Sequence, residues 1–254
     1  MSVLSPEQIA QYQQDGYTIL RNALSEEDLH ALRTHIEGIA SGDLPFPEES
    51  IEFDPNAPQQ RHIDHLRKIN GPSECDPFFR DHAVREPLLT AAADLLGPDL
   101  KLYGDQVFIK GPGGIEKTYH QDSAYFYIEP MDLATAWVAL DDVTLENGCL
   151  WVVSGSHREG LVDHSEVWMV GERQDKTVPD AAIDRRREQP ILLQAGDCSF
   201  HHSLLLHRSG PNQTVTRRRG MATHYMSARS RWTGNPQDKP DYPLLRGQEH
   251  AGCV

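Results

Sequence analysis

Hydrophobic residues recur at helical spacing within the first hundred positions of the chain. In residues 25–42, Leu and Ile follow one another at intervals of three and four, which places them on one face of a helix. Residues 5–16 open with Ser-Pro-Glu-Gln, a capping-box sequence that predicts another helix, and residues 17–20 predict a short strand after it. An apolar stripe predicts a helix over residues 77–96. Residues 43–66 are polar and Pro-rich, which predicts a loop.

From residue 97 onward the pattern changes to short apolar runs, rich in aromatic and β-branched residues and separated by Gly and Pro. Such runs are typical of β-strands divided by turns. Because the helices precede the strands instead of alternating with them, the pattern favours a mainly β fold with flanking helices (a sandwich, barrel or jelly roll) over a doubly wound parallel sheet. The predicted strands are residues 100–103, 106–110, 119–127, 135–140, 149–153, 191–193, 198–202, 204–207 and 221–226.

The length of the chain indicates one domain, because 254 residues are enough to bury one hydrophobic core. We expect a single domain over 1–254, with a helical part at 1–98 and a β core at 99–230. Residues 154–190 hold many charges and few strand signals. They predict a long excursion from the core that acts as a lid or a binding loop.

Composition and charge argue against several classes of function. The formal net charge is −14 at pH 7, and a basic face for nucleic acid cannot form without a still more acidic remainder. No apolar run reaches the roughly 18 residues that a membrane span needs, and no signal-peptide pattern is visible. The four cysteines form neither a CxxC motif nor a dense disulfide framework. We therefore expect a cytoplasmic protein, a monomer or small homo-oligomer, that binds a small molecule and neither nucleic acid nor a membrane.

The 13 histidines are the unusual count, and they direct attention to metal chemistry. His120 and Asp122 lie two residues apart in the predicted strand 119–127, and residues i and i+2 of a strand point to the same face. His207, at the end of an apolar run, is the best-placed third ligand. Two histidines and one carboxylate on one face of a metal are the ligand set of non-haem Fe(II) oxygenases, since cosubstrate, O2 and substrate need the remaining positions.

Spacing alone leaves other interpretations of this pair open. A second His-x-Asp sequence, at residues 62–64, lies in the polar segment with no strand pattern around it, where a solvated loop is the better interpretation. His120 and Asp122 can themselves be ordinary polar residues of a surface or a core. Their strand context is what favours the metal site.

A second group of residues follows His207. Iron sites of this kind commonly use a dicarboxylic keto acid as cosubstrate, and its distal carboxylate needs a buried cation, best a bidentate Arg, with a hydroxyl donor nearby. Ser209 shares a strand face with His207 if the strand continues, and Arg218 lies near the start of a returning strand. The alternative is that the Arg triplet 217–219 is a solvated turn, because three adjacent Arg on a strand cannot all point inward.

Together these residues resemble the phytanoyl-CoA dioxygenase family of Fe(II)- and 2-oxoglutarate-dependent oxygenases. The resemblance covers nearly the whole chain and rests on several motifs that occur in order. They are residues 4–6 (Leu-Ser-Pro), 14–17 (Gln-Asp-Gly-Tyr), 120–122 (His-Gln-Asp), 136–140 (Ala-Trp-Val-Ala-Leu), 145–150 (Leu-Glu-Asn-Gly-Cys-Leu), 154–157 (Ser-Gly-Ser-His), 195–197 (Ala-Gly-Asp) and 207–209 (His-Arg-Ser). The resemblance implies a double-stranded β-helix, a cupin-like jelly roll, with helices packed outside it.

The resemblance also implies roles for individual residues. His120, Asp122 and His207 are the implied iron ligands. Arg218 is implied to hold the distal carboxylate of 2-oxoglutarate, with Ser209 beside it. The other residues that the resemblance associates with the cosubstrate are Lys68, Trp137, Gln106 and Gln121.

Each of these four further residues also has an ordinary interpretation. Lys68 can be a surface lysine, and Trp137 fits a core position as well as a pocket wall. Gln106 departs from a related branch that often carries Met there. Gln121 points to the opposite face from its two neighbours on a regular strand.

The resemblance implies an enzyme that uses Fe(II), 2-oxoglutarate and O2 to oxidise a substrate C–H bond, with release of succinate and CO2. Hydroxylation is the expected outcome, while desaturation, epimerisation or cyclisation need only a different placement of the substrate. Asp122 disfavours halogenation, because halogenating relatives replace this carboxylate with a small residue.

The substrate is predicted only by class. Tyr125, Phe126, Trp151 and Arg208 are expected around it, which predicts a small, partly apolar molecule such as a natural product or a lipid-like compound. Two alternatives of another class remain: a non-catalytic jelly roll that binds a metal or ligand, and a zinc hydrolase with the same three ligands. Both leave Ser209 and Arg218 without a reason for their spacing.

Overall fold

The structure, a computed structural model, describes residues 2–170 and 173–254 and contains two main antiparallel β-sheets. The large sheet consists of β1 (Tyr17–Leu20), β2 (Ile51–Phe53), β3 (Leu66–Asn70), β4 (Leu100–Lys110), β7 (Leu133–Ala139), β12 (Cys198–His202), β14 (Arg218–Ser227) and β16 (Leu244–Arg246). The small sheet consists of β5 (Lys117–His120), β8 (Leu150–Val153), β11 (Glu188–Ile191) and β13 (His207–Ser209). Two short pairs join β6 (Ile128–Glu129) to β15 (Arg231–Trp232), and β9 (Glu166–Val170) to β10 (Arg173–Thr177).

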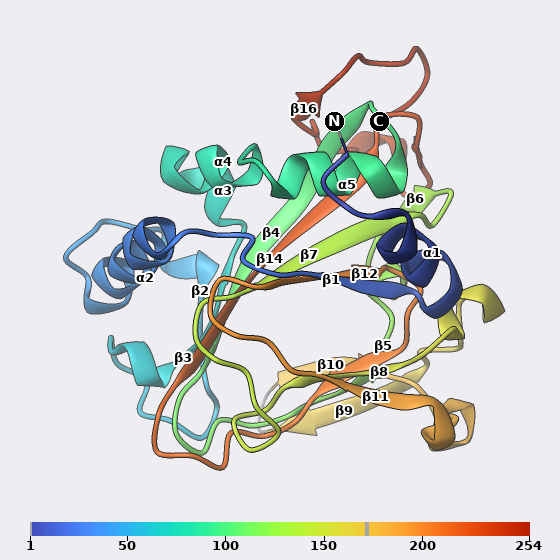
Figure 1. Cartoon of the computed structure of the whole chain (residues 1–254). Helices are drawn as coiled ribbons and strands as arrows, with labels where there is room; N and C mark the ends of the chain where they lie inside the picture. The colour runs from blue at the N-terminus through green and yellow to red at the C-terminus, as the bar shows by residue number, and fades with distance from the viewer. Residues whose placement is uncertain (1, 171–172) are drawn as a thin grey trace.

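The strand order shows how the sheets are built. The large sheet runs β1-β12-β7-β14-β4-β3-β2, with β16 paired to β4, and the small sheet runs β11-β8-β13-β5. The small sheet lies across from one face of the large sheet, and the helices pack on the opposite face (Figure 1). The described chain therefore has the expected mainly β fold with flanking helices, a double-stranded β-helix.

The helices are α1 (Pro6–Asp15), α2 (Glu26–Ser41), α3 (Pro72–Cys75), α4 (Pro77–Ala83) and α5 (Leu88–Leu96). Ser5 and Gln8 form the predicted capping box of α1, since each side chain bonds the other's backbone N–H. The apolar face of α2 is buried in the core that the helices form with the large sheet. The predictions for α1, β1 and α2 are confirmed. Short 3-10 turns occur at η1 (Glu48–Ser50), η2 (Ile63–His65), η3 (Asp122–Ala124), η4 (Ser156–Glu159), η5 (Asp180–Ala182), η6 (Arg185–Arg187) and η7 (Pro236–Asp238).

Several predicted elements differ from those in the structure. The single helix expected over 77–96 is two helices, because Pro87 lacks an N–H and disfavours helical backbone at the residue before it. The loop expected over 43–66 contains β2, which pairs with β3. The two strands expected within 100–110 are one strand, β4, which pairs along its length with β14. The strand expected over 204–207 is a turn that leads into β13.

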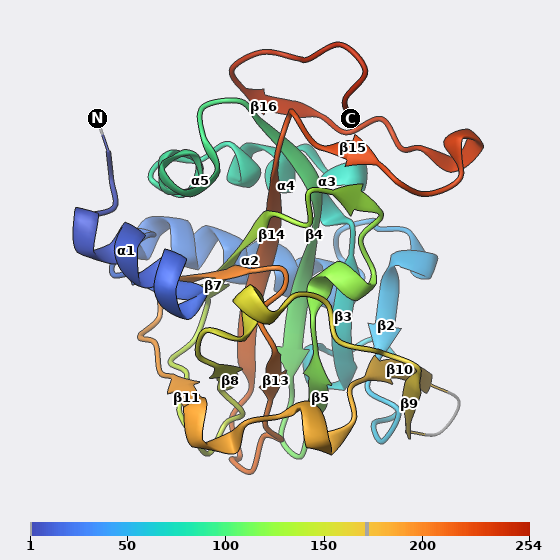
Figure 2. The same cartoon turned by 90° about the vertical axis from the view of Figure 1, so that its right-hand side faces the viewer.

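The excursion 154–190 contains the hairpin β9–β10, which lies beside β5 (Figure 2). Residues 171–172, within this range, lie outside the described residues. The hairpin follows from pairing of Glu166–Val170 with Arg173–Thr177, and the sequence showed few strand signals there. Among the described helices, none has the length and apolar character that crossing a membrane requires.

Candidate metal centre

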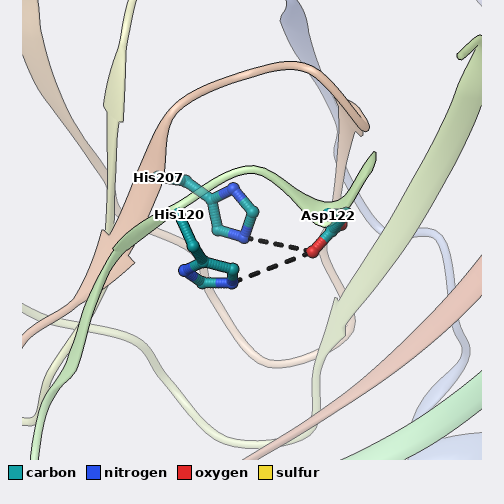
Figure 3. Close-up of side chains that lie close together, drawn as sticks. All are labelled: His120, Asp122 and His207. Atoms are coloured by element: carbon teal, nitrogen blue, oxygen red, sulfur yellow. Dashed lines mark ion pairs between the residues drawn. The ribbon is translucent and has the colours of Figure 1, made fainter. Parts of the chain in front are cut away.

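His120, Asp122 and His207 meet in the space between the two sheets (Figure 3). His120 is the last residue of β5, His207 is the first residue of β13, and the two are partners in the antiparallel register. One Asp122 oxygen, Oδ1, lies 3.8 Å from Nε2 of His120 and 3.6 Å from Nε2 of His207. The three ligand atoms all lie within 4.8 Å of one another, so one cation can contact all three.

Asp122 reaches the two histidines by a different route from the one expected. The strand β5 ends at His120, and Asp122 begins the 3-10 turn η3. The predicted strand over 119–127, and with it the i, i+2 argument, is therefore wrong. The turn bends the chain after Gln121 and brings the carboxylate back beside His120.

Hydrogen bonds fix which ring nitrogen of each histidine faces the carboxylate. Nδ1 of His120 lies 2.9 Å from the carbonyl oxygen of Thr118, and Nδ1 of His207 lies 2.9 Å from that of Leu205. A carbonyl only accepts, so each Nδ1 carries the proton and donates it. Each Nε2 therefore presents its lone pair to the centre, which is the form that binds a metal.

The protonation states of these three residues also suit a cation. Burial lowers the pKa of His207 to about 4, and burial together with His207 holds the pKa of His120 well below its usual value. Burial alone would raise the pKa of Asp122, but the surrounding histidines, His207 foremost, bring it well below the usual value. At neutral pH the site thus offers two neutral imidazoles and one carboxylate.

A hydrogen-bond chain supports Asp122 from the large sheet. The Thr135 hydroxyl donates to Oδ2 of Asp122 at 3.0 Å and lies 2.9 Å from Nδ1 of His224. Because Thr135 has one hydroxyl proton, Nδ1 of His224 must donate to it. Nε2 of His201 lies 3.6 Å from the same carboxylate oxygen. These contacts orient the carboxylate as outer-shell partners orient metal ligands.

The residues expected at a keto-acid cosubstrate line the same cavity. They are Arg218, Ser209, Lys68, Trp137 and Gln106. Arg218 begins β14, and its guanidinium carbon lies 5.2 Å from the centre of the Trp137 ring. Burial lowers the pKa of Arg218 to about 10.

The Arg218 side chain is held but not neutralised. Its Nη2 donates to the carbonyl oxygen of Gly148 at 2.8 Å, while its buried Nε has no hydrogen-bond partner. A buried guanidinium with a donor to spare suits an anionic ligand. Together with the three donor atoms described above, it fits an iron ion and a carboxylate cosubstrate.

Gln121 is placed differently from the other expected cosubstrate residues. Its Nε2 donates to the carbonyl oxygens of Gly160 and Leu204, and its Oε1 accepts from the N–H of Val162. It is fully buried and is absent from the described cavity lining. These contacts indicate that Gln121 ties the turn after β5 to the segment near residue 160.

Of the residues expected around the substrate, three line the cavity: Tyr125, Phe126 and Arg208. Trp151 is not among the described lining residues, and its ring lies 5.0 Å from the guanidinium carbon of Arg208. Leu150, the neighbour of Trp151 on β8, lines the cavity instead, because successive strand residues face opposite ways.

Other residues of the cavity were not predicted. Lys110, Thr135 and His224 line it, as do Arg67, Lys117 and Asp175. Lys110 had a signal in the sequence: residues 106, 108 and 110 alternate along β4, and all three line the cavity. Asp175 had none, because its hairpin was not predicted.

Asp175 ties the hairpin β9–β10 to the body of the domain. Its Oδ1 lies 2.6 Å from Nζ of Lys117 on β5, and its Oδ2 lies 3.7 Å from the Arg67 guanidinium on β3. Next to it, the Lys176 N–H donates to the Tyr125 hydroxyl at 3.0 Å. The hairpin is thus held at the edge of the cavity by charged and polar contacts.

Known proteins share this fold across nearly the whole chain. A non-haem monooxygenase, ThoJ, superposes with a TM-score of 0.74 at 26% identity, covering 97% of this chain and 86% of that one. The structure of EctD from S. alaskensis with 2-oxoglutarate and 5-hydroxyectoine superposes with a TM-score of 0.77 at 22% identity, covering 99% of this chain and 87% of that one. The latter likeness concerns the fold.

Among relatives by sequence, the human peroxisomal phytanoyl-CoA dioxygenase is 28% identical over 240 residues, which is 89% of this chain and 70% of that protein. A probable alpha-ketoglutarate-dependent hypophosphite dioxygenase of Stutzerimonas stutzeri is 25% identical over 227 residues, or 87% of this chain and 78% of that protein. Fold and relatives together define the class, that of iron- and 2-oxoglutarate-dependent oxygenases. The sequence pattern of the phytanoyl-CoA dioxygenase (PhyH) family matches residues 12–220, and the chain belongs to this family.

Membership confirms the enzyme class expected from the sequence, an oxidoreductase with Fe(II) and 2-oxoglutarate as its cofactors. The relatives' names cover quite different small molecules, so the family does not fix the substrate.

Proposed function

We propose that His120, Asp122 and His207 bind Fe(II) in this chain and that the enzyme hydroxylates a C–H bond of a small, partly apolar molecule. The observation that carries this proposal is that two Nε2 atoms and one Asp122 oxygen lie close enough together to contact a single cation. When bound, Fe(II) would enable O2 to react with 2-oxoglutarate, which yields succinate and CO2 and oxidises a C–H bond of the substrate. The chain supplies the ligands, the orientation and a partly closed cavity.

The cosubstrate is proposed to lie between the iron ligands and Arg218. The guanidinium and the Ser209 hydroxyl both line this end of the cavity and suit a distal carboxylate. Trp137 forms a flat wall there, because Gly220 leaves room for its indole: a Cβ on Gly220 would lie 2.1 Å from that ring. Lys68 and Gln106 are proposed to complete the wall.

The substrate is proposed to lie beside Tyr125 and Phe126. The Tyr125 ring centre is 6.2 Å from that of the proposed ligand His120, and the Phe126 ring centre is 5.0 Å from that of His224, which supports Asp122 through Thr135. Desaturation, epimerisation or cyclisation remain alternative outcomes, because they require the same iron centre and a different substrate position.

We further propose that the chain forms a single domain in which residues 154–190 act as a lid. We propose that the protein is cytoplasmic and is a monomer or a small homo-oligomer.

The first test measures succinate formed from 2-oxoglutarate by anaerobically prepared Fe(II) protein after O2 is admitted, with and without a panel of small molecules. We expect Fe(II)-dependent succinate that at least one panel member stimulates. Asp122→Ala and Arg218→Ala should abolish it, whereas Arg217→Ala, which removes a neighbouring arginine bonded to Asp64, should not. Full activity of Asp122→Ala would exclude the proposed ligand set, and a wild-type protein that neither binds nor consumes 2-oxoglutarate would favour a metal-binding or zinc-hydrolase function.

A further inference from the structure

Lys110 and Arg218 are direct partners across the antiparallel pair of β4 and β14. Both side chains line the cavity. Like charges directly opposite one another on neighbouring strands are destabilising, and the cost rises when the charges leave water. A ligand of opposite charge bound in the cavity would offset this repulsion.

Neither cation is neutralised by the chain. Nζ of Lys110 donates to the Ser209 hydroxyl at 2.8 Å and to the carbonyl oxygen of Gly210. Arg218 donates to the Gly148 carbonyl and leaves its Nε without a partner. In the part of the chain that the structure describes, no carboxylate forms an ion pair with Lys110 or Arg218.

A second lysine on β4 shows what a neutralised buried lysine looks like in this fold. Lys101 is 3% exposed, and its Nζ pairs with Oε1 of Glu249 at 3.2 Å. Lys110 lacks such a partner at the other end of the same strand. Its contacts, a hydroxyl and a carbonyl, position the ammonium without cancelling its charge.

The contact between Lys110 and Ser209 also sets the role of the hydroxyl. An ammonium group only donates, so the Ser209 oxygen accepts from it. The single hydroxyl proton of Ser209 then stays available for another acceptor. Lys110, Ser209 and Arg218 therefore all present donors to the same end of the cavity. Glu116 also lines the cavity and acts on Lys110 through space, but among the described residues it forms no ion pair with it, so the three donors can still receive one carboxylate with two oxygens.

We propose that Lys110 is a second cation for the distal carboxylate of the keto-acid cosubstrate, and that it makes this enzyme selective for dianionic over monoanionic keto acids. This inference rests on the proposed function of the site. Burial and the neighbouring Arg218 lower the pKa of Lys110, so a bound carboxylate is also what stabilises its ammonium form.

The test compares two keto acids that differ only at the distal end. 2-Oxovalerate carries a methyl group where 2-oxoglutarate carries the distal carboxylate. The affinity of each is measured by titration calorimetry on Mn(II)-loaded protein, without turnover, for wild type, Lys110→Met and Lys101→Met. Lys101→Met is the matched control, because it removes a buried lysine from the same strand outside the cavity. Lys110→Gln, which keeps polar contacts with Ser209, replaces Lys110→Met if that variant does not fold.

We expect the preference of the wild type for 2-oxoglutarate over 2-oxovalerate to fall by about tenfold or more in Lys110→Met, as loss of a charge-assisted hydrogen bond predicts. Affinity for 2-oxovalerate should stay nearly unchanged, which a merely structural role of Lys110 would not produce. Lys101→Met should keep the wild-type preference.

Two outcomes would overturn the inference, and they differ in what they say of the site. An unchanged preference in Lys110→Met, with wild-type binding intact, removes Lys110 from the carboxylate site and leaves the proposed function standing. A wild-type protein that binds neither keto acid removes both proposals.

Discussion

His120 and His207 face one another across the pair β5–β13, with ring centres 4.2 Å apart. Each ring is held through Nδ1 by the carbonyl oxygen two residues before it in the chain. The same backbone hydrogen bond thus sets the tautomer of both residues. Because this bond does not involve a metal, the two Nε2 atoms are oriented toward Asp122 before a metal binds.

Removal of one of these rings should remove the metal. In His207→Ala we expect the affinity for Fe(II) or Mn(II) to fall by more than about 100-fold. Loss of an outer-shell partner costs up to about 100-fold, and loss of a direct ligand should cost more. Metal content after dialysis against the free ion measures this. His30→Ala, at an exposed position, serves as control, and stoichiometric metal in His207→Ala would rule out the proposed ligand set.

The hydroxyl of Thr135 should tune the site without binding the metal. Thr135→Val removes the donor to Asp122 and leaves Nδ1 of His224 without its acceptor. We expect metal affinity to fall by roughly 10-fold or more, in line with outer-shell effects. Thr223→Val is the matched control: this threonine is equally buried, and its hydroxyl makes no hydrogen bond. Equal metal affinities in the two variants would refute an orienting role for Thr135.

The affinity of the site for metal should begin to fall only at an unusually low pH. Burial lowers the pKa of His207 to about 4, so the ring stays neutral down to about pH 5 and competes little with a metal for protons. The measurement is Mn(II) affinity between pH 8 and 4.5 in non-coordinating buffer. We expect a nearly constant affinity above pH 5.5; a tenfold loss between pH 7 and 6 would contradict a neutral, preorganised ligand pair.

The sequence predicted which three side chains meet better than it predicted the backbone geometry that brings them together. His120 and Asp122 were chosen as neighbours on one strand face, yet the strand ends at His120 and a 3-10 turn brings Asp122 back. Strand periodicity alone carries no information about where a strand ends, since that depends on the partner strand β13, which is only three residues long. The spacing of the residue types left other interpretations open, and the resemblance to a family was needed to choose the metal site.

Other parts of the site depend on contacts distant in sequence. Lys110 was visible as a strand residue, but only its partner Arg218 shows that two cations share one cavity. Asp175 belongs to a charged hairpin with weak strand propensity, which forms because its two halves pair with each other and its carboxylate meets Arg67 and Lys117. Propensity cannot show such tertiary pairing.

The ion pairs of Asp175 should hold the hairpin closed. Asp175→Asn removes the charge that faces Lys117 and Arg67, whose side chains are only 20% and 14% exposed, so the pairs are screened less than surface pairs are. We expect the amides of the described hairpin strands to exchange hydrogen about tenfold faster, equal to ~1.4 kcal/mol of opening free energy. The control is Asp180→Asn, because Asp180 is 80% exposed and pairs with Arg185, a kind of pair that contributes little. Unchanged exchange in Asp175→Asn would mean that other contacts hold the hairpin.

A buried histidine outside the site should limit stability in acid. His82 on α4 is 2% exposed, and neither ring nitrogen has a hydrogen-bond partner. Burial, assisted by Arg85, lowers its pKa to about 4 from a usual 6.5. Between these two values the unfolded chain binds a proton that the folded chain does not, so the free energy of unfolding falls as the pH falls from 6.5 to 4.

His82→Leu should remove this loss. The apolar side chain has similar size and carries no proton, so the variant should gain stability over wild type as the pH is lowered, by about 2 kcal/mol more at pH 5 than at pH 8. Urea unfolding at the two pH values measures the difference. His30→Leu controls for the loss of one exposed histidine. A stability gain that is the same at pH 5 and pH 8 would show that His82 contributes through its unpaired nitrogens alone and not through protonation of the unfolded chain.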